Sequence, residues 1–375
     1  MRLFLPRVLS QKRPKFMSKI LICTGIYPPA IGGPAQYAKE IEGEFRGQGH
    51  VVKVLTYTLE HHLPPLVRHE LFFWKTFLAI LNMRMSGKNS DDFILTLDTF
   101  SVGWPAVVAA KILGKKILIR TGGDFLWESY VERTGDLVLL KNFYDTRQVK
   151  LNLKERTIFA VTKWTLQNVS AVIFSTEWQR DIFTRAYNLD PGKNFVVENF
   201  YGEKIPTEFA SAGQSESRGG KKVFVAGTRP LKWKNIERLK LAFDLARKND
   251  WMIDLGIDID LDLSLVSHKK FIEKVSSSHA VILVSLGDIS PNMIMDALKT
   301  NTPFIVTKET GLLDRLKEVG IFVDPENTED IKQKILFLAD KNNYEVQKKK
   351  IESFNFTHSW EEICQEILAI AHKTI

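Results

Sequence analysis

Short apolar runs recur along the chain, and most are followed by a polar or glycine-rich loop. Runs of this length with no polar alternation are typical of strands that are buried on both faces of a parallel sheet. The predicted strands are Lys19–Cys23, Val51–Leu55, Phe93–Leu97, Lys116–Arg120, Val169–Ser175, Phe195–Val197, Lys222–Ala226, Ala280–Val284, Phe304–Val306 and Gly320–Val323.

Segments with helical periodicity lie between these runs. They cover Ala35–Gln48, Trp104–Leu113, 141–168, Glu177–Tyr187 and, at the end of the chain, Trp360–Lys373. Strands that alternate with helices predict an α/β fold with doubly wound parallel sheets.

The alternation is interrupted once. Residues 202–221 are small and polar, rich in glycine and serine, and without periodicity, as in a linker. The pattern restarts at Lys222, which predicts a domain boundary near residue 205. We therefore expect domains at 17–205 and 206–352, followed by a C-terminal segment at 353–375.

Residues 70–85, ELFFWKTFLAILNMRM, form a strongly apolar predicted helix. The segment is shorter than the roughly 20 apolar residues that span a bilayer. Burial against the sheet is the favoured interpretation, and a helix lying in a membrane interface is the alternative.

Composition adds three constraints. The 375 residues are 44% apolar and 26% charged, as in an ordinary globular protein long enough for two cores. The net charge is +8, but residues 1–16 hold five cations and no acid. The remaining +3, without an aromatic-basic motif, does not indicate nucleic-acid binding. Cys23 and Cys364 cannot form a disulfide framework or a zinc cluster, which suggests a reducing compartment.

Residues 1–16 admit three readings: a basic tail, a membrane-surface anchor, or a segment preceding a true start at Met17. They lack the apolar core of a signal peptide. We expect a dispensable and disordered extension.

The stretch from Ser285 to Gly311 is the most informative for chemistry. It follows the predicted strand Ala280–Val284 and reads as a polar loop, a helix and a second strand, and ligands of open α/β sheets bind at such loops. Asp288 lies in the loop. Asp296 lies within an otherwise apolar helical run, where an ionised carboxylate needs a partner.

Two other loops follow strands in the first half of the chain. Gly32-Gly33 precedes a helix, so backbone N–H groups there could approach a ligand; a tight strand-to-helix turn is the alternative. Asp124 follows two glycines, where it could face a ligand or simply cap the next helix.

In the second half, Arg229 and Lys234 lie in a strand-to-helix turn. A guanidinium and an ammonium this close suit a diphosphate, although solvated surface cations are the alternative. Asp258, Asp260 and Asp262 alternate with apolar residues, which favours a half-exposed strand over a calcium loop.

The order and spacing of these pieces resemble the GT-B retaining glycosyltransferases, especially family four, from about Lys19 to the C-terminus. The resemblance implies two Rossmann-like domains facing each other across a cleft, with the final helix crossing back to the first domain. The family's signature is two glutamates separated by seven residues. Asp288 and Asp296 have that spacing, each one methylene shorter.

By this resemblance, Asp288 would lie near the transferred sugar and Asp296 would bind the ribose. Arg229 and Lys234 would hold the diphosphate and stabilise its leaving charge. Asp124 would lie beside the reacting sugar. Backbone amides of the donor-binding segment would assist at Ser290, Pro291, Asn292 and Met293, and Gly32 and Gly33 would pass near the phosphates.

The expected activity is retaining, metal-independent transfer of a hexosyl group from a nucleotide sugar to an acceptor hydroxyl. The acceptor would be a carbohydrate or lipid-linked molecule of cell-surface polysaccharide or glycolipid synthesis. No cofactor is expected. We expect a cytoplasmic protein, with possible peripheral contact at the inner membrane face.

Two alternatives stay open. A nucleotide-sugar epimerase or dehydrogenase is weakened by the lack of a G-x-G-x-x-G sequence after any strand. A catalytically altered subunit that binds a sugar or a partner protein is kept open by the two aspartates.

Overall fold

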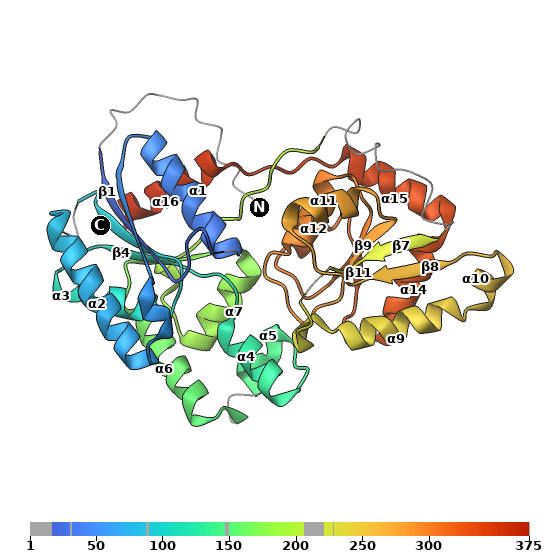
Figure 1. The fold of residues 1–375 in the computed structure, drawn as a ribbon, viewed down its shortest axis with the longest axis horizontal. Helices are drawn as coiled ribbons and strands as arrows, with labels where there is room; N and C mark the ends of the chain where they lie inside the picture. The colour runs from blue at the N-terminus through green and yellow to red at the C-terminus, as the bar shows by residue number, and fades with distance from the viewer. Residues whose placement is uncertain are drawn as a thin grey trace. The chain divides into compact units, whose positions relative to one another are not determined.

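The computed structural model describes residues 17–30, 32–87, 90–146, 150–205, 221–227 and 229–374. The expected N-terminal extension, residues 1–16, and most of the expected linker lie outside the described residues. Figure 1 shows two parallel sheets with helices packed around them.

The first sheet has six strands in the order β2-β1-β3-β4-β5-β6. The pairs β1–β2, β1–β3, β3–β4 and β5–β6 are parallel. The central strands are buried along their length because helices cover both faces, as their unbroken apolar sequences predict. The strands are β1 (Lys19–Thr24), β2 (Val51–Thr56), β3 (Phe93–Thr96), β4 (Ile117–Arg120), β5 (Ala171–Phe174) and β6 (Asn194–Val196).

The helices that follow these strands begin and end close to the expected positions. The 141–168 segment forms two helices instead of one, because Asn152 caps a new start through a capping box with Glu155. The helices are α1 (Gly33–Gly47), α2 (Pro65–Asn82), α3 (Gly103–Ile112), α4 (Phe125–Thr134), α5 (Leu140–Thr146), α6 (Leu153–Gln167) and α7 (Glu177–Tyr187).

The second sheet has five strands in the order β11-β10-β9-β7-β8, and all its pairs are parallel. Its strands are β7 (Lys222–Val225), β8 (Ile259–Asp262), β9 (Ala280–Leu283), β10 (Phe304–Thr307) and β11 (Ile321–Val323). Its helices include α9 (Ile236–Arg247), α10 (Asp250–Asp254), α11 (His268–Ser276), α12 (Asn292–Lys299), α13 (Leu313–Leu316), α14 (Thr328–Ala339) and α15 (Lys341–Ser353).

The aspartate-rich stretch is a strand only over β8, and the helix α10 precedes it. Its three carboxylates pair with three different cations. Asp258 contacts Lys221 at 3.0 Å, Asp260 contacts Arg247 at 3.2 Å and Asp262 contacts Lys274 at 2.9 Å. Within the described residues, no group of three or more acidic, histidine or cysteine side chains is placed to hold a metal.

The described residues divide into two compact units. Unit 1 holds those within Met1–Ile119, Val169–Ala171 and Ile367–Ile375, and unit 2 holds Arg120–Asn168 and Val172–Glu366. The first sheet therefore contributes strands to both units, and the boundary near residue 205 stays a prediction about the domains.

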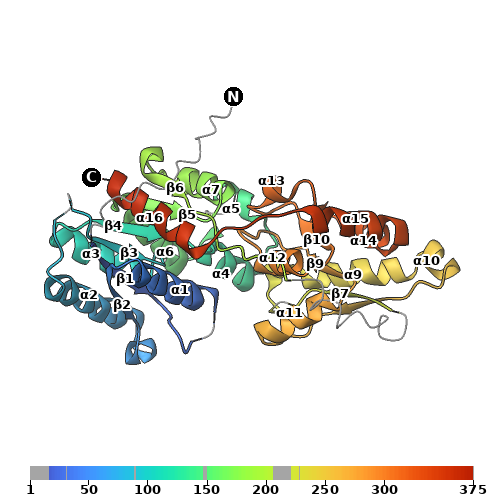
Figure 2. The same cartoon turned by 90° about the horizontal axis from the view of Figure 1, so that it is seen from above.

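The C-terminal helix α16 (Trp360–Lys373) begins in unit 2 and ends in unit 1. Its last turn is tied to the first sheet, because buried Lys116 donates to the carbonyl of Ala371 at 2.6 Å and Asp91 contacts His372 at 2.7 Å. Figures 1 and 2 both show α16 beside α1. The expected return of the final helix is confirmed.

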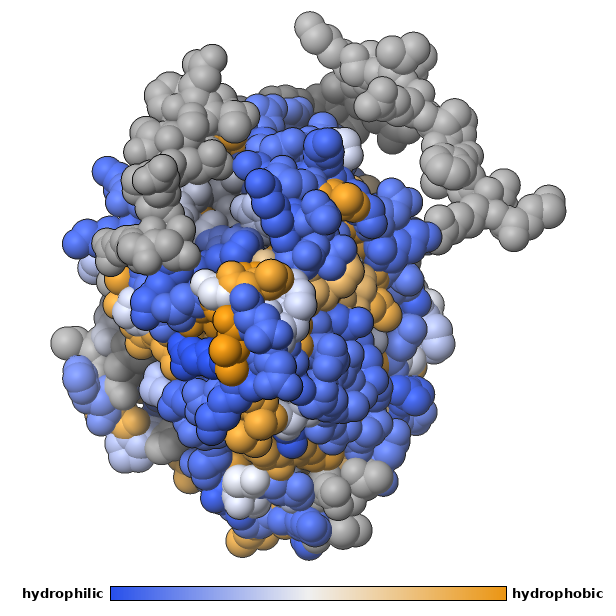
Figure 3. Space-filling model, turned by 90° about the vertical axis from the view of Figure 1, so that its right-hand side faces the viewer, coloured by the Kyte–Doolittle hydropathy of each residue, from blue (hydrophilic) through white to orange (hydrophobic). Residues whose placement is uncertain are grey.

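No described helix combines the length and the apolar character needed to cross a bilayer. The side of the molecule viewed in Figure 3 is mostly hydrophilic, with hydrophobic residues in small groups between charged ones.

Candidate active site

The turn between β7 and α9 presents the two predicted phosphate-binding cations. It is anchored by buried Asn235, whose left-handed backbone (φ 62°) is a conformation that asparagine tolerates. The Asn235 amide donates to the carbonyls of Val284 and Pro325, at 3.1 and 2.7 Å. These bonds tie the turn to the loops after β9 and β11, so the backbone at the neighbouring Lys234 is held in place.

Lys234 forms an ion pair with Asp288, at 2.8 Å between Nζ and Oδ2. Both side chains are mostly buried, and the ammonium also lies 4.1 Å from the ring centre of Trp233. The Asp288 backbone is held by the neighbouring strand end, since its N–H donates to Glu309 and its carbonyl accepts from Gly311. The structure thus joins two residues that lie far apart in the sequence.

Arg229 is exposed at the start of the same turn. Its backbone carbonyl accepts from the N–H of Leu231 at 2.7 Å. Burial raises the pKa of the nearby Glu128 carboxyl, and the positive charge of Arg229 lowers it.

Asp296 lies in α12 and is almost fully buried. Burial raises the pKa of its carboxyl group, and the exposed His268 opposes that shift from 3.0 Å. Sequence analysis did not single out His268. A histidine at the first position of α11 has no sequence signal that links it to a helix encoded 28 residues later.

The segment Ser290–Met293 forms the start of α12. Pro291 is the N-cap residue, and Asn292 and Met293 begin the helix, where backbone N–H groups have no partner within the helix. Pro291 itself has no N–H to donate. The Ser290 hydroxyl lies 3.3 Å from that of Tyr201.

Asp124 caps α4. One carboxylate oxygen accepts from the N–H of Trp127 at 3.1 Å, and the other accepts from the hydroxyl of Tyr144 at 2.6 Å. Tyr144 in turn contacts Tyr187 at 2.8 Å. Burial raises the pKa of Asp124. The capping alternative from the sequence is therefore present in the structure, and a role beside the sugar stays a prediction.

Glu128, one turn further along α4, was missed in the sequence. Its carboxylate folds back over Gly123, where a Cβ would lie 2.8 Å from Oε1. Burial raises its pKa to about 7, and the charge of Asp124 adds to the shift. Lys234 and Arg229 oppose it. Glu128 thus lies within the electrostatic reach of both predicted phosphate-binding cations.

Glu309 is a second acid that the sequence did not reveal. It follows β10, it is buried, and its carboxylate pairs with Lys141 of α5 at 2.6 Å. The pairing neutralises this acid without using Arg229 or Lys234.

Gly32 and Gly33 belong to unit 1, at the start of α1. Gly32 has φ 154° and ψ 157°, a region of backbone space that is open almost only to glycine. The other predicted site residues all belong to unit 2.

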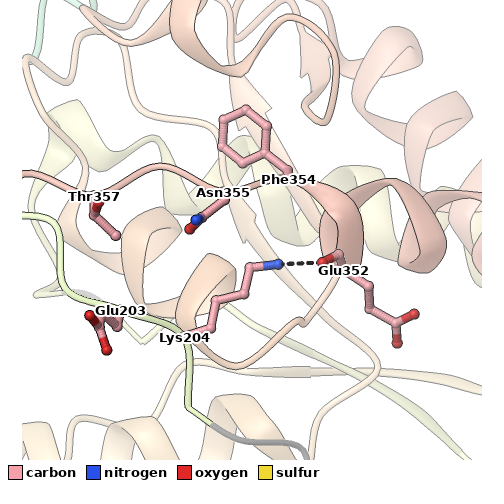
Figure 4. Close-up of a pocket in the computed structure, with 6 residues that line it drawn as sticks. All are labelled: Glu203, Lys204, Glu352, Phe354, Asn355 and Thr357. Carbon is pink, nitrogen blue, oxygen red and sulfur yellow. Dashed lines mark hydrogen bonds between the residues drawn. The ribbon is translucent and has the colours of Figure 1, made fainter. Parts of the chain in front are cut away.

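A separate hollow lies where the chain leaves α15 (Figure 4). Lys204 points into it and donates to the carbonyl of Glu352 at 2.9 Å. None of the predicted site residues lines it. Its lining is Glu203, Lys204, Glu352, Phe354, Asn355 and Thr357.

Comparison with known proteins places the fold. No family model and no curated protein matches the sequence. Among solved structures, sucrose-phosphate synthase from Thermosynechococcus elongatus is similar with a TM-score of 0.65 and 14% identity, over 95% of this chain and 98% of that one.

Two further structures are similar over nearly the whole chain. WaaG, a glycosyltransferase involved in lipopolysaccharide biosynthesis, has a TM-score of 0.62 and 10% identity, over 94% of this chain and 99% of its own. HepE from Anabaena, in complex with UDP and glucose, has a TM-score of 0.57 and 13% identity, over 95% and 97%.

The chain has the GT-B fold of these glycosyltransferases. The fold expected from the order of motifs is confirmed. The similarity of structure shows the fold alone, because the sequence identities are only 10–14%.

Proposed function

We propose that the protein is a retaining glycosyltransferase that moves a sugar from a nucleotide-diphosphate donor to an acceptor hydroxyl. The observation that carries the proposal is the Lys234–Asp288 ion pair, 2.8 Å long, at the carboxyl ends of β7 and β9. Ligands of open α/β sheets bind at strand ends of this kind.

The chemistry needs positive charge where the diphosphate leaves. Lys234 supplies a mostly buried ammonium and Arg229 an exposed guanidinium, which can bind two phosphate oxygens at once. A diphosphate arriving at Lys234 would compete with Asp288 for the ammonium. Asp288 would then be released to accept a hydrogen bond from the sugar.

Asp296 would bind the ribose hydroxyls, together with or in exchange for His268. The acceptor hydroxyl would attack on the face that the diphosphate leaves, and a leaving phosphate oxygen would take the acceptor's proton. The N–H groups at the start of α12 would support the phosphate charge. The acceptor class is carbohydrate or lipid-linked, encountered at the inner membrane face.

A second candidate is a subunit that binds a nucleotide sugar without transferring it. The Asp296–His268 contact favours it, because it engages the acid that the ribose would need. Nucleotide binding without turnover on any acceptor is the result that would select this candidate.

The test compares Arg229→Ala/Lys234→Ala with a matched pair, Lys240→Ala/Lys248→Ala. The control removes two cations of the same region: Lys240 lies within α9, and Lys248 is the C-cap residue of that helix. UDP-, GDP- and ADP-sugars are screened by thermal shift, since a ligand of the native state raises its apparent stability. We expect one nucleotide to stabilise the wild type and the control. An equal response from the Arg229/Lys234 variant would refute the phosphate assignment.

A further inference from the structure

Helix α2 carries apolar side chains on two opposite faces. One face is buried and includes Phe72, Ala79 and Ile80, which pack within unit 1. This buried face is what the favoured sequence interpretation of residues 70–85 expected.

The opposite face of α2 is exposed and equally apolar. Its residues recur every three or four positions, so they form one stripe along the helix. Trp74 is 50% exposed and Leu78 is 53% exposed. Single exposed apolar residues are normal on a protein surface, but a contiguous group of them is unusual. The stripe comprises Val67, Leu71, Trp74, Leu78 and Leu81, and Leu66 extends it at the start of the helix.

Positive charge gathers at the C-terminal end of this stripe. The ammonium of Lys19 donates to the carbonyl of Arg84 at 2.8 Å, and that of Lys115 donates to the carbonyl of Met85 at 2.6 Å. A carbonyl oxygen carries no net charge, so these hydrogen bonds do not neutralise the two ammonium groups. In the described part of the chain, neither lysine forms an ion pair with a carboxylate.

The neighbouring helix contributes to the same end. Lys115 follows α3, so its contact with Met85 places the C-terminal ends of α2 and α3 together. Ile112, at the end of α3, is 63% exposed and Lys111 beside it is exposed. An apolar surface with cations at one border is therefore built from two helices.

Lys19, at this border, is the first residue of β1. In the sequence, residues 1–16, with five cations and no acid, precede this strand.

We propose that the exposed stripe of α2 docks the protein on a lipid bilayer that carries anionic headgroups. Apolar side chains would enter the boundary between headgroups and acyl chains, with the helix lying in the plane of the membrane. Trp74 suits that boundary because its ring is amphipathic. The cations at the end of α2 and α3 would contact anionic headgroups.

Only the purpose of this surface, which is to hold the protein near a lipid-linked acceptor, rests on the proposed function. The surface itself stands on exposure and charge. A second copy of the chain is the alternative occupant. If two α2 stripes paired side by side in parallel, their positively charged ends would meet and repel each other.

The test is sedimentation of the full chain with vesicles of phosphatidylcholine, with and without phosphatidylglycerol. The test variant is Leu71→Gln/Trp74→Gln/Leu78→Gln. The control is Leu241→Gln/Leu245→Gln/Ile253→Gln, which removes similarly exposed apolar residues from α9 and α10. Because all six side chains are at least 40% exposed, both variants are expected to fold.

We expect the wild type and the control to bind vesicles containing phosphatidylglycerol, less at high salt, and the α2 variant to bind at least tenfold more weakly. Equal binding by the α2 variant, or no binding by the wild type, would overturn the proposal. So would a wild-type dimer that the α2 substitutions convert to a monomer. Thermal shift with UDP, GDP and ADP on the same samples separates this outcome from the proposed function, because the α2 variant is expected to keep any nucleotide response.

Discussion

Replacing Glu128 with glutamine is expected to stabilise the protein at alkaline pH. Burial raises the pKa of this carboxyl to about 7, against 4.5 for a solvated glutamate. The unfolded chain therefore loses this proton at a lower pH than the folded chain does. Between the two pKa values the folded state holds the extra proton, so the free energy of unfolding falls as the pH rises.

The size of the effect follows from the pKa difference. About 2.5 units at about 1.36 kcal/mol each give an upper bound of about 3 kcal/mol, which is reached above pH 7. Residual solvent contact of the half-buried side chain lowers this value. Glutamine has nearly the same shape and no charge, so Glu128→Gln removes the penalty.

The assay is urea unfolding at pH 5 and pH 8, followed by tryptophan fluorescence. Trp127 precedes Glu128 in the sequence, and its ring centre lies 5.4 Å from that of Trp233, so both tryptophans report on this region. We expect the advantage of Glu128→Gln over the wild type to grow by about 2 kcal/mol between these pH values. Glu237→Gln, on the surface of α9, should show no such growth. A flat difference for Glu128→Gln, or a wild type that is more stable at pH 8, would refute the reasoning.

Three further changes test other parts of unit 2, and one of their control variants lies in unit 1. Gly311→Ala would place a methyl group against a backbone carbonyl, so urea unfolding should show a loss of about 1–3 kcal/mol; Gly43→Ala, where the space is open, should gain about 0.5–1 kcal/mol. His268→Ala should raise the pKa of Asp296 further, so the variant should lose stability relative to the wild type as the pH rises from 4 to 8, and Asp296→Asn should abolish that loss. Tyr144→Phe removes a 2.6 Å hydrogen bond to the cap of α4 and should cost about 1–3 kcal/mol in thermal or urea unfolding, whereas an unchanged stability would show that the bond is dispensable.

The parallel sheets could be predicted because their strands are buried on both faces. An unbroken run such as Ala280–Val284 has few alternatives once a polar loop follows it, and it forms β9 in the structure. Helix ends set by side-chain caps were harder to predict. The split of residues 141–168 depends on the reciprocal bonds of Asn152 and Glu155, which compete with continued helix.

The site could be predicted only in part. Loops after strands marked Asp288 and Lys234, but their 2.8 Å contact depends on which strands are neighbours in the sheet. Glu128 carries no signal in a sequence, because its raised pKa comes first from burial, which depends on how other elements pack around it, and then from the nearby charge of Asp124. For α2 the sequence left burial and a membrane-interface helix both open, since apolar residues on all sides of a helix normally indicate burial, and the structure shows that one apolar face is exposed.

The central claim is transfer of a sugar from a nucleotide sugar, and the release of nucleoside diphosphate tests it most directly. Purified protein is incubated with UDP-, GDP- and ADP-sugars, with and without a fraction of lipid-linked saccharides as acceptor. We predict release that depends on the acceptor, a product with the anomeric configuration of the donor by NMR, and loss of both in Arg229→Ala/Lys234→Ala. Binding of a nucleotide sugar with no acceptor-dependent release, or a product of inverted configuration, would contradict the account.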